Sequence, residues 1–363
     1  MLAAKLFRDY GSAIRAASRR GDIGGLRAVF NVFLARMAYG VGPFYHSVFQ
    51  MDRFPERVWS DFVVSKEFNE ITRIINGEKN YRLARDKIIF INHCLQNGIS
   101  TVSPLGLLVR KSDDRRGDVI CVSTEREFGQ LLQACPDQLF FKIVDGAHGE
   151  RAFRATRGLA GTWFVEGRAL RTEELYGFAI ARLGADTGWL IQPVVSVHDD
   201  LLPIMPGGAL GTVRIVTYLT NDGAKPLRPI IRIPAGGNVT DNFSCGMSGN
   251  LVAAVDVDTG LLGLGKGSRQ KVWPDLVDIA YHPDTGAAIL GRLVPYWKET
   301  LELVIMAQEK TPALRTLGWD VAITNCGPVV LEANTLYGVE ILQCAYGKPI
   351  RNELLPIFEM LDF

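Results

Sequence analysis

Two carboxylates and an amide near the C-terminal end of the sequence have the spacing of a metal-binding hairpin. The stretch GWDVAITNCGPVVLEANTLYG predicts two short strands around a turn at residues 325–327. With Cys326 at the centre, residue 324 pairs with 328 and Asp320 with Glu332, so that their Cβ atoms lie roughly 5 Å apart. Asn334 shares that face because side chains alternate along a strand. Such oxygen ligands are those that Mg²⁺ takes; the alternative is a surface hairpin with solvated acids.

A lysine in the apolar strand FFKIV is the second candidate group. Lys142 is followed directly by the loop DGAHG, which contains Gly146, His148 and Gly149. Exposed backbone N–H groups beside an ammonium group suit a polyphosphate. The spacing is not that of a Walker A motif, so no P-loop fold is implied. The alternative is an edge-strand lysine beside an ordinary turn.

Two arginines on neighbouring predicted strands form the third group. Arg214 lies in GTVRIVTYL and Arg232 in IIRIP, and we expect these strands to pair around residues 221–223. A guanidinium fork suits a transferring phosphoryl group, although a strand arginine is more often a solvated charge. The long, glycine-rich segment after Arg232 contains Asp241 and Asn242. Loops of this length are more often functional than not, and a disordered surface loop is the alternative.

The elements that must position these residues fall into three regions. We expect a helical region at residues 1–97, strands with two helices at 98–190, and antiparallel hairpins with a long helix at 191–363. This pattern predicts an α+β fold of mostly antiparallel sheets with helices packed on them. The predicted helices include residues 28–39, 65–75, 81–95, 124–135, 172–183 and 287–309. Thr124 and Glu127 have the spacing of a capping box at the start of the fourth of these.

The composition is that of an ordinary globular protein. Of 363 residues 47% are hydrophobic, and there are 40 Lys and Arg and 39 Asp and Glu. This near-zero net charge does not favour nucleic acid as a partner. No apolar run reaches the ~18 residues of a membrane span. Six cysteines without C-x-x-C pairs indicate a reducing environment, and we expect a cytoplasmic protein. The basic first twenty residues predict a helix packed on the domain, with a membrane-surface contact as the less favoured alternative.

Taken in this order, the motifs resemble those of the ATP-grasp superfamily. VLEANTLYG is similar to the corresponding run of D-alanine–D-alanine ligases, and D-x(11)-E-x-N matches their metal ligands. The strand T-x-R-I-V-T, the D-N-F glycine loop, H-P-x-T-G and G-W-D-x-A-I-T resemble the sugar-transfer-associated subgroup, which is related to alpha-L-glutamate ligases. The resemblance extends from about residue 60 onward. It implies two α+β subdomains that clasp ATP, preceded here by helices instead of the usual Rossmann-like domain.

The resemblance also implies roles for individual residues. Asp320, Glu332 and Asn334 would bind Mg²⁺. Lys142 would hold the α- and β-phosphates, Lys87 would add a second cation, and residues 146–149, with His148 among them, would cover the β- and γ-phosphates. The remaining roles that the resemblance implies are Gln192 and the Val194 backbone at adenine, Asp199 or Asp200 at ribose, and Arg214 at the transferred phosphoryl group. The acceptor pocket cannot be transferred from the better-known ligases, and our own candidates for it are Arg232, Asp241, Asn242 and His282.

One departure from the pattern concerns the cation beside the metal. D-alanine ligases carry an arginine two residues before the metal aspartate, where this chain has Gly318. We therefore expect Arg214 or Arg232 to take over that function.

These roles predict an ATP- and Mg²⁺-dependent ligase that joins a carboxylate to an amine through an acyl phosphate. An amino acid or an amino-sugar-containing acceptor is the expected kind of substrate. A small-molecule kinase on the same fold and a non-catalytic ATP-binding module are the alternatives. We expect small-molecule partners, no nucleic acid and no transmembrane segment, and a homodimer is one open oligomeric state.

Overall fold

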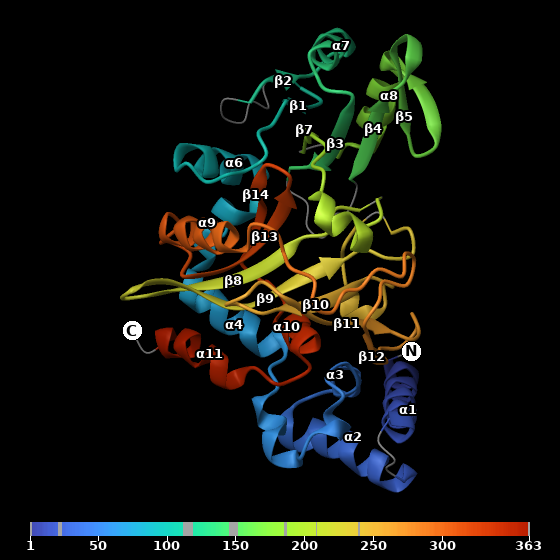
Figure 1. Cartoon of the computed structure of the whole chain (residues 1–363), viewed down its shortest axis with the longest axis vertical. Coiled ribbons are helices and arrows are strands. Elements are labelled where there is room, and N and C mark those ends of the chain that lie inside the picture. Colours follow the sequence, from blue (N-terminus) through green and yellow to red (C-terminus); the bar gives the residue numbers. More distant parts are fainter. Residues whose placement is uncertain are drawn as a thin grey trace.

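Two seven-stranded sheets form most of the molecule (Figure 1). The computed structural model describes residues 2–20, 24–111, 119–144, 152–184, 187–207, 209–238 and 240–361. In Figure 1 the first sheet lies at the top, the second sheet crosses the middle and the first three helices, within residues 2–48, lie at the bottom. The expected α+β architecture with a helical front and mostly antiparallel sheets is confirmed.

The first sheet has the order β2-β1-β7-β3-β4-β5-β6, and only the β1–β2 pair is parallel. Helices α7 (Glu125–Gln133) and α8 (Thr172–Arg182) pack on one face, where Phe128 and Leu175 meet Phe141, Phe153 and Trp189. The predicted capping box starts α7. The strands are β1 (Gly106–Leu108), β2 (Cys121–Val122), β3 (Gln138–Ile143), β4 (Phe153–Arg157), β5 (Thr162–Val165), β6 (Arg168–Arg171) and β7 (Trp189–Pro193). The expected boundary between residues 190 and 191 thus falls inside β7.

The second sheet is antiparallel throughout, in the order β12-β11-β10-β9-β8-β13-β14. One face packs on α9 (Trp297–Glu309) and α6 (Lys87–Gln96), and the other on α4 (Ser65–Asn76) and α10 (Val339–Tyr346). The strands are β8 (Val213–Thr220), β9 (Gly223–Ile233), β10 (Leu251–Val255), β11 (Leu262–Ser268), β12 (Leu276–Ile279), β13 (Thr316–Thr324) and β14 (Gly327–Asn334).

The remaining helices are mainly N-terminal. They are α1 (Leu2–Arg20), α2 (Gly25–Tyr39), α3 (Pro43–Val48), α5 (Arg82–Arg85) and the C-terminal α11 (Arg351–Phe358). Short 3-10 helices are η1 (Met51–Arg53), η2 (Glu56–Asp61), η3 (Glu78–Asn80), η4 (Leu159–Gly161), η5 (Asp199–Ile204), η6 (Ser244–Gly246) and η7 (Glu359–Leu361). Within the described residues, no helix is long and apolar enough to cross a membrane.

Two predicted helices are corrected by the structure. The helix expected at residues 81–95 is divided at Asp86, whose carboxylate accepts hydrogen bonds from the Ile88 and Ile89 amides and so caps α6. The helix expected at residues 287–309 begins only at Trp297. Before it, Gly286 and Gly291 adopt positive φ angles and isolated bridges pair residues 281 with 288 and 261 with 293. Apolar residues at helical spacing therefore also occur in the segment before Trp297, where the helix actually starts.

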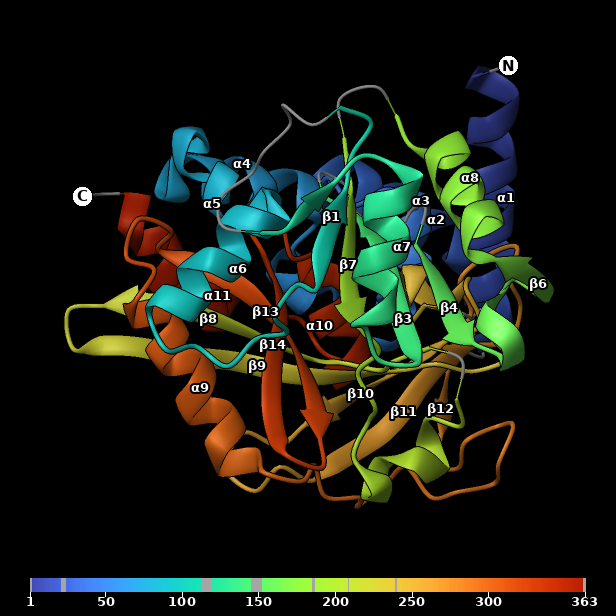
Figure 2. The same cartoon turned by 90° about the horizontal axis from the view of Figure 1, so that it is seen from above.

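The two sheets meet along β14. Seen from above, β13 and β14 pass beneath β1, β7 and β3 (Figure 2). The Val330 amide donates to the Ser100 carbonyl, and Thr101 pairs with Val330 just before the chain enters the first sheet. The hairpin that carries Asp320 and Glu332 is thus the part of the second sheet next to the first.

Candidate functional site

The β13–β14 hairpin places Asp320 directly opposite Glu332, as the sequence predicts. The predicted turn is nevertheless wrong by one residue, because Thr324 pairs with Gly327 and not with residue 328. Between Asp320 and Val321 the register shifts, so that Leu331 is an extra residue on β14. This bulge compensates for the shorter turn and restores the carboxylate pair.

Two arginines hold the Asp320 carboxylate. Arg214 lies opposite Asp320 on β8, and its Nε and Nη2 donate to the two carboxylate oxygens at 2.8 Å each. Arg232 Nη2 approaches Oδ2 at 2.9 Å. Burial alone would raise the pKa of Asp320, but the two guanidinium groups lower it below its ordinary value. Asp320 is therefore a buried, firmly ionised carboxylate.

Arg232 extends the cluster to the glycine-rich segment. Its Nε lies 3.1 Å from Oδ2 of Asp241, which also accepts a hydrogen bond of 2.7 Å from the Thr212 hydroxyl. Burial raises the pKa of Asp241 against the opposing effect of Arg232, and the nearby charge of Asp320 adds to the rise. The structure thus brings Arg214, Arg232, Asp241 and Asp320 into one cluster.

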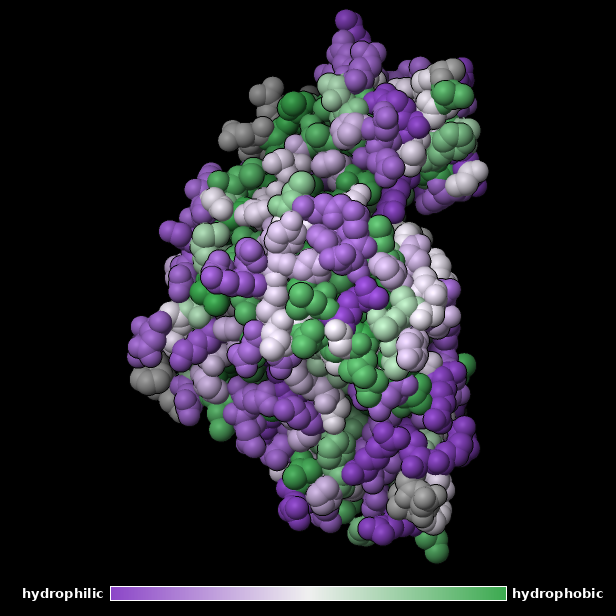
Figure 3. Space-filling model, viewed as in Figure 1, coloured by the Kyte–Doolittle hydropathy of each residue, from purple (hydrophilic) through white to green (hydrophobic). Residues whose placement is uncertain are grey.

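Lys142 reaches this region from the first sheet. Its Nζ lies 4.0 Å from Oε1 of Glu332, which is partly exposed. Burial lowers the pKa of Lys142, the Glu332 carboxylate opposes this change and the Lys87 ammonium adds to it. Lys87 begins α6 and donates to the Val144 carbonyl at 3.4 Å. Lys142 therefore meets Glu332 where the sheets adjoin, and Lys87 is close enough to affect the charge of Lys142. Figure 3 shows the surface indented between the upper part and the body below it.

The face of the first sheet that carries Lys142 also carries Gln192 and Arg154. Phe140 pairs with both Gln192 and Arg154, and Lys142 pairs with Leu190, so these side chains lie on the face opposite α7 and α8. Arg154 was not among the residues predicted from the sequence. The alternation in FRATR, with buried Phe153 and Ala155, could have revealed it once this strand was paired with FFKIV.

The residues expected at adenine are already engaged. The Gln192 amide donates to the Val102 carbonyl at 2.6 Å, and the Val194 N–H donates to the Gln138 carbonyl at 3.0 Å. A backbone contact between Val194 and adenine would therefore have to use the Val194 carbonyl.

Other expected residues lie further from the cluster. The Asp199 carboxylate accepts from the Asn325 side chain at 3.0 Å, at the hairpin turn and about 16 Å along an extended strand from Asp320. His282 uses both ring nitrogens, one bonded to the Pro234 carbonyl and one accepting from the Asp284 amide, so it shapes the loop. The Asn242 carbonyl accepts from Asn250. Asp200 follows Asp199 in η5, and Gly146, His148 and Gly149 lie outside the described residues.

The family assignment follows from a match over most of the chain. The family model described as sugar-transfer associated ATP-grasp matches residues 67–358. This chain belongs to the sugar-transfer associated ATP-grasp family. Its fold is therefore the ATP-grasp fold, here preceded by a helical region.

Solved ATP-grasp structures resemble this family member only distantly. The D-alanine–D-alanine ligase from Coxiella burnetii is 12% identical with a TM-score of 0.41, over 77% of this chain and 58% of that one. The biotin carboxylase–β,γ-ATP complex from Campylobacter jejuni is 10% identical with a TM-score of 0.43, over 77% and 47%. The chain thus spans about half the length of these proteins. No curated protein matches it.

The ATP-grasp family member has an oxygen donor set that fits a divalent cation. A carboxylate offers about four lone-pair positions. Oδ2 of Asp320 accepts from Arg214, Arg232 and Asn334, whereas Oδ1 accepts from Arg214 alone among the described residues. Oδ1 and the Glu332 carboxylate are ligands of the type that Mg²⁺ takes. The Asn334 amide now donates to the Gly318 carbonyl and to Oδ2 of Asp320, and it would have to turn and give up both contacts to present its oxygen.

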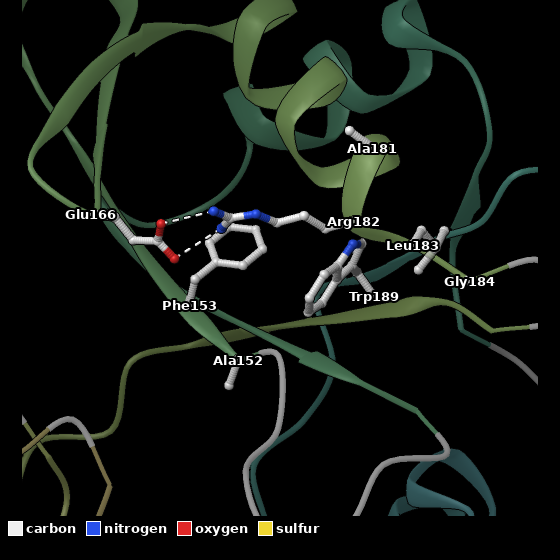
Figure 4. Close-up of a pocket in the computed structure, with 8 residues that line it drawn as sticks. All are labelled: Ala152, Phe153, Glu166, Ala181, Arg182, Leu183, Gly184 and Trp189. Carbon is white, nitrogen blue, oxygen red and sulfur yellow. Dashed lines mark hydrogen bonds and ion pairs between the residues drawn. The ribbon is translucent and has the colours of Figure 1, made fainter.

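A separate pocket lies on the other side of the first sheet (Figure 4). It has a volume of about 560 Å³, and Phe153 and Trp189 line it from the face that packs on α8. Arg182 spans it to form a bidentate ion pair with Glu166 at 2.8 and 2.9 Å. Because this face is opposite to that of Lys142, the pocket is not part of the charged cluster.

Proposed function

We propose that this member of the ATP-grasp family is an ATP- and Mg²⁺-dependent ligase that joins a carboxylate to an amine. A carboxylate oxygen of the acid attacks the γ-phosphorus of ATP and ADP leaves, which forms an acyl phosphate. The amine nitrogen then attacks the acyl carbon, phosphate leaves and the nitrogen loses a proton. The product is an amide or peptide bond.

The meeting of Lys142 and Glu332 is the observation that supports this proposal. The two side chains come from different sheets and lie 4.0 Å apart, directly beside the buried Asp320 cluster. A lone lysine on an apolar strand is seldom buried without a partner. Here it lies between a carboxylate of the expected metal set and a second ammonium group, as a triphosphate site requires.

The residues of this chain have separate tasks in the proposed reaction. Lys142 and Lys87 bind phosphate oxygens, and Arg214 and Arg232 keep Asp320 ionised while they offer guanidinium groups to the transferred phosphoryl oxygens. Mg²⁺, held by Asp320, Glu332 and Asn334, would neutralise charge that develops on these oxygens. Residues 146–149 would cover the phosphates, and this role stays a prediction. The acid and amine would bind next to Asp241.

The compartment is proposed on separate grounds. All six cysteines are free thiols, and three of them are buried. Thiols that stay unpaired are expected in a reducing compartment, which supports a cytosolic location.

The test is ADP release by the Glu332→Ala variant. Pure protein is incubated with ATP, Mg²⁺ and pooled amino acids or amino sugars, and ADP, phosphate and new masses are measured. Losing a metal carboxylate costs several kcal/mol of transition-state stabilisation, so amine-dependent ADP release should fall by two or more orders of magnitude, roughly. Glu302→Ala, on the exposed face of α9, is the matched control.

Each result has a defined meaning. Free phosphate together with an amide product supports a ligase, whereas a stable phosphorylated product would make the protein a kinase. Near-normal turnover by Glu332→Ala would refute the metal assignment. If ATP with Mg²⁺ fails to raise the melting temperature of the unchanged protein, both enzymatic functions are refuted.

A further inference from the structure

An exposed apolar stripe runs along α2, on the side opposite the buried face of that helix. Ala28, Val32 and Ala35 face the protein. The stripe follows the helical spacing i, i+3, i+4, i+7 and i+11. Two of its members are almost fully exposed, Leu26 at 90% and Met37 at 82%, and the other three are partly exposed. We name it the α2 stripe, and it consists of Leu26, Val29, Phe30, Phe33 and Met37. A helix that is apolar on nearly all sides is usually covered by another apolar phase.

Basic side chains flank the α2 stripe and also lie on an exposed face of α1. Arg27 and Arg36 flank it on either side of α2, and both are exposed. On α1, Arg8, Arg15 and Arg19 are exposed at a spacing of seven and four residues, which places them on one face. Residues 1–40 contain seven Lys and Arg against two Asp, a net charge of +5, whereas the whole chain has +1 and the remainder is therefore −4. Positive charge is thus concentrated in the two helices that expose apolar side chains.

The two helices form one firmly attached unit. Tyr10 of α1 stacks on Phe33 of α2, with ring centroids 4.6 Å apart. Arg20 at the end of α1 is almost fully buried and pairs with Asp52 at 3.0 Å and with Asp275 at 3.4 Å. In Figure 1, α2 lies at the end of the long axis remote from the first sheet. A surface that contacts α2 would therefore leave the Lys142–Glu332 region free.

We propose that α1 and α2 dock on an anionic membrane surface. Such a surface offers both an apolar layer for the α2 stripe and negative headgroups for the flanking arginines. A second copy of this chain is a poorer occupant, because a two-fold contact through this patch would bring the exposed arginines of two copies face to face. The helices lie in the interface and do not cross the membrane. The inference does not rest on the proposed ligase activity.

Vesicle co-sedimentation tests the proposal. The full chain should bind vesicles of phosphatidylcholine mixed with phosphatidylglycerol, bind phosphatidylcholine vesicles weakly, and dissociate as salt is raised. Reversing the charge in Arg8→Glu/Arg15→Glu/Arg19→Glu should weaken binding on the order of 100-fold. Phe30→Ser/Phe33→Ser/Met37→Ser should weaken it at least about tenfold, since the apolar contribution is lost. Of the replaced side chains, only those of Phe30 and Phe33 are expected to affect packing. The melting temperature of each variant is measured to check that it is folded.

The matched controls alter exposed residues elsewhere. Val272→Ser removes an apolar side chain that is 87% exposed, and Lys298→Glu reverses an exposed charge on α9. Both variants should bind anionic vesicles like the unchanged protein. Absence of binding to anionic vesicles, or equal binding by the serine variant, overturns the proposal. Sedimentation velocity decides the remaining case. If the protein does not bind vesicles but forms a dimer that only the serine variant loses, the stripe is a contact with a second copy of the chain.

Discussion

Replacing Asp320 by Asn should destabilise the protein more than any other single change of charge in the cluster. The carboxylate receives three contacts from guanidinium nitrogens, at 2.8, 2.8 and 2.9 Å, and it is buried. In the variant, Arg214 and Arg232 would keep their positive charges without this partner. Removing one member of a buried ion pair costs about 3–5 kcal/mol, because the remaining charge stays desolvated.

The expected loss can be measured as a melting temperature. For a chain of 363 residues, about 4 kcal/mol corresponds to a decrease in melting temperature of roughly 5 °C. Asp258→Asn is the control, since Asp258 is exposed, and its melting temperature should change by less than about 1 °C. Both variants are measured in the presence of a chelator, so that bound metal does not contribute.

The pH dependence gives a second, independent test. Because the folded-state pKa of Asp320 is lowered, the stability that it supplies is present above the ordinary Asp range and is lost as pH falls through the lowered folded-state value. The difference between the unchanged protein and Asp320→Asn should therefore be largest near neutral pH and shrink below about pH 4. A difference that stays constant down to acid pH would contradict the assigned cause.

A double-mutant cycle refines the result. If Arg214 is the main group left unpaired, Arg214→Met/Asp320→Asn should be more stable than the sum of the two single changes implies, by about 1–3 kcal/mol. Urea unfolding of the four proteins measures this coupling. Additive effects would refute the view that Arg214 and Asp320 stabilise the fold as a pair.

Two further changes test the site and its surroundings. Lys142→Met should abolish most of the rise in melting temperature that ATP with Mg²⁺ produces. In the unchanged protein, ATP affinity should begin to fall with rising pH below the ordinary lysine pKa, because the pKa of Lys142 is lowered. Isothermal titration across pH checks this, and an unchanged pH profile in the variant would contradict it. Gly318→Ala should destabilise the protein by about 1–3 kcal/mol, since a Cβ there would overlap the buried Tyr337 side chain. Gly263→Ala is the control, because the atoms nearest to a Cβ at that position lie 3.8 Å away. Equal stability of the two variants would contradict the steric explanation.

Local patterns predicted those parts of the fold whose causes are local. The capping box of Thr124 and Glu127, the hairpin at residues 213–233 and the Asp320–Glu332 pair all depend on residues close in sequence. The start of the helix predicted at residues 287–309 was wrong, because apolar spacing alone does not show that Gly286 and Gly291 turn the chain. The turn was misplaced because a bulge at Leu331 leaves no local signal.

Contacts that depend on strand order could not be predicted from the sequence. Arg214 meets Asp320 because β13 inserts between β8 and β14, although β8 and β13 are separated by about a hundred residues in the chain. Arg154 required the pairing of β3 with β4, and the engagement of both His282 nitrogens required the position of Pro234. The sequence identified the types of residue in the site, and only the sheet topology showed which of them face one another.

The same topology explains why the cation beside Asp320 comes from β8 and not from β13. Position 318 lies two residues before Asp320 on the same face, but the Tyr337 side chain fills the space next to it. Tyr337 is buried and its hydroxyl bonds to Thr316, so it cannot yield to an arginine without unpacking the hairpin. Arg214 lies directly opposite Asp320 on the neighbouring strand and donates hydrogen bonds to both oxygens of its carboxylate. An arginine supplied across the sheet therefore provides the charge that the strand itself has no room to carry.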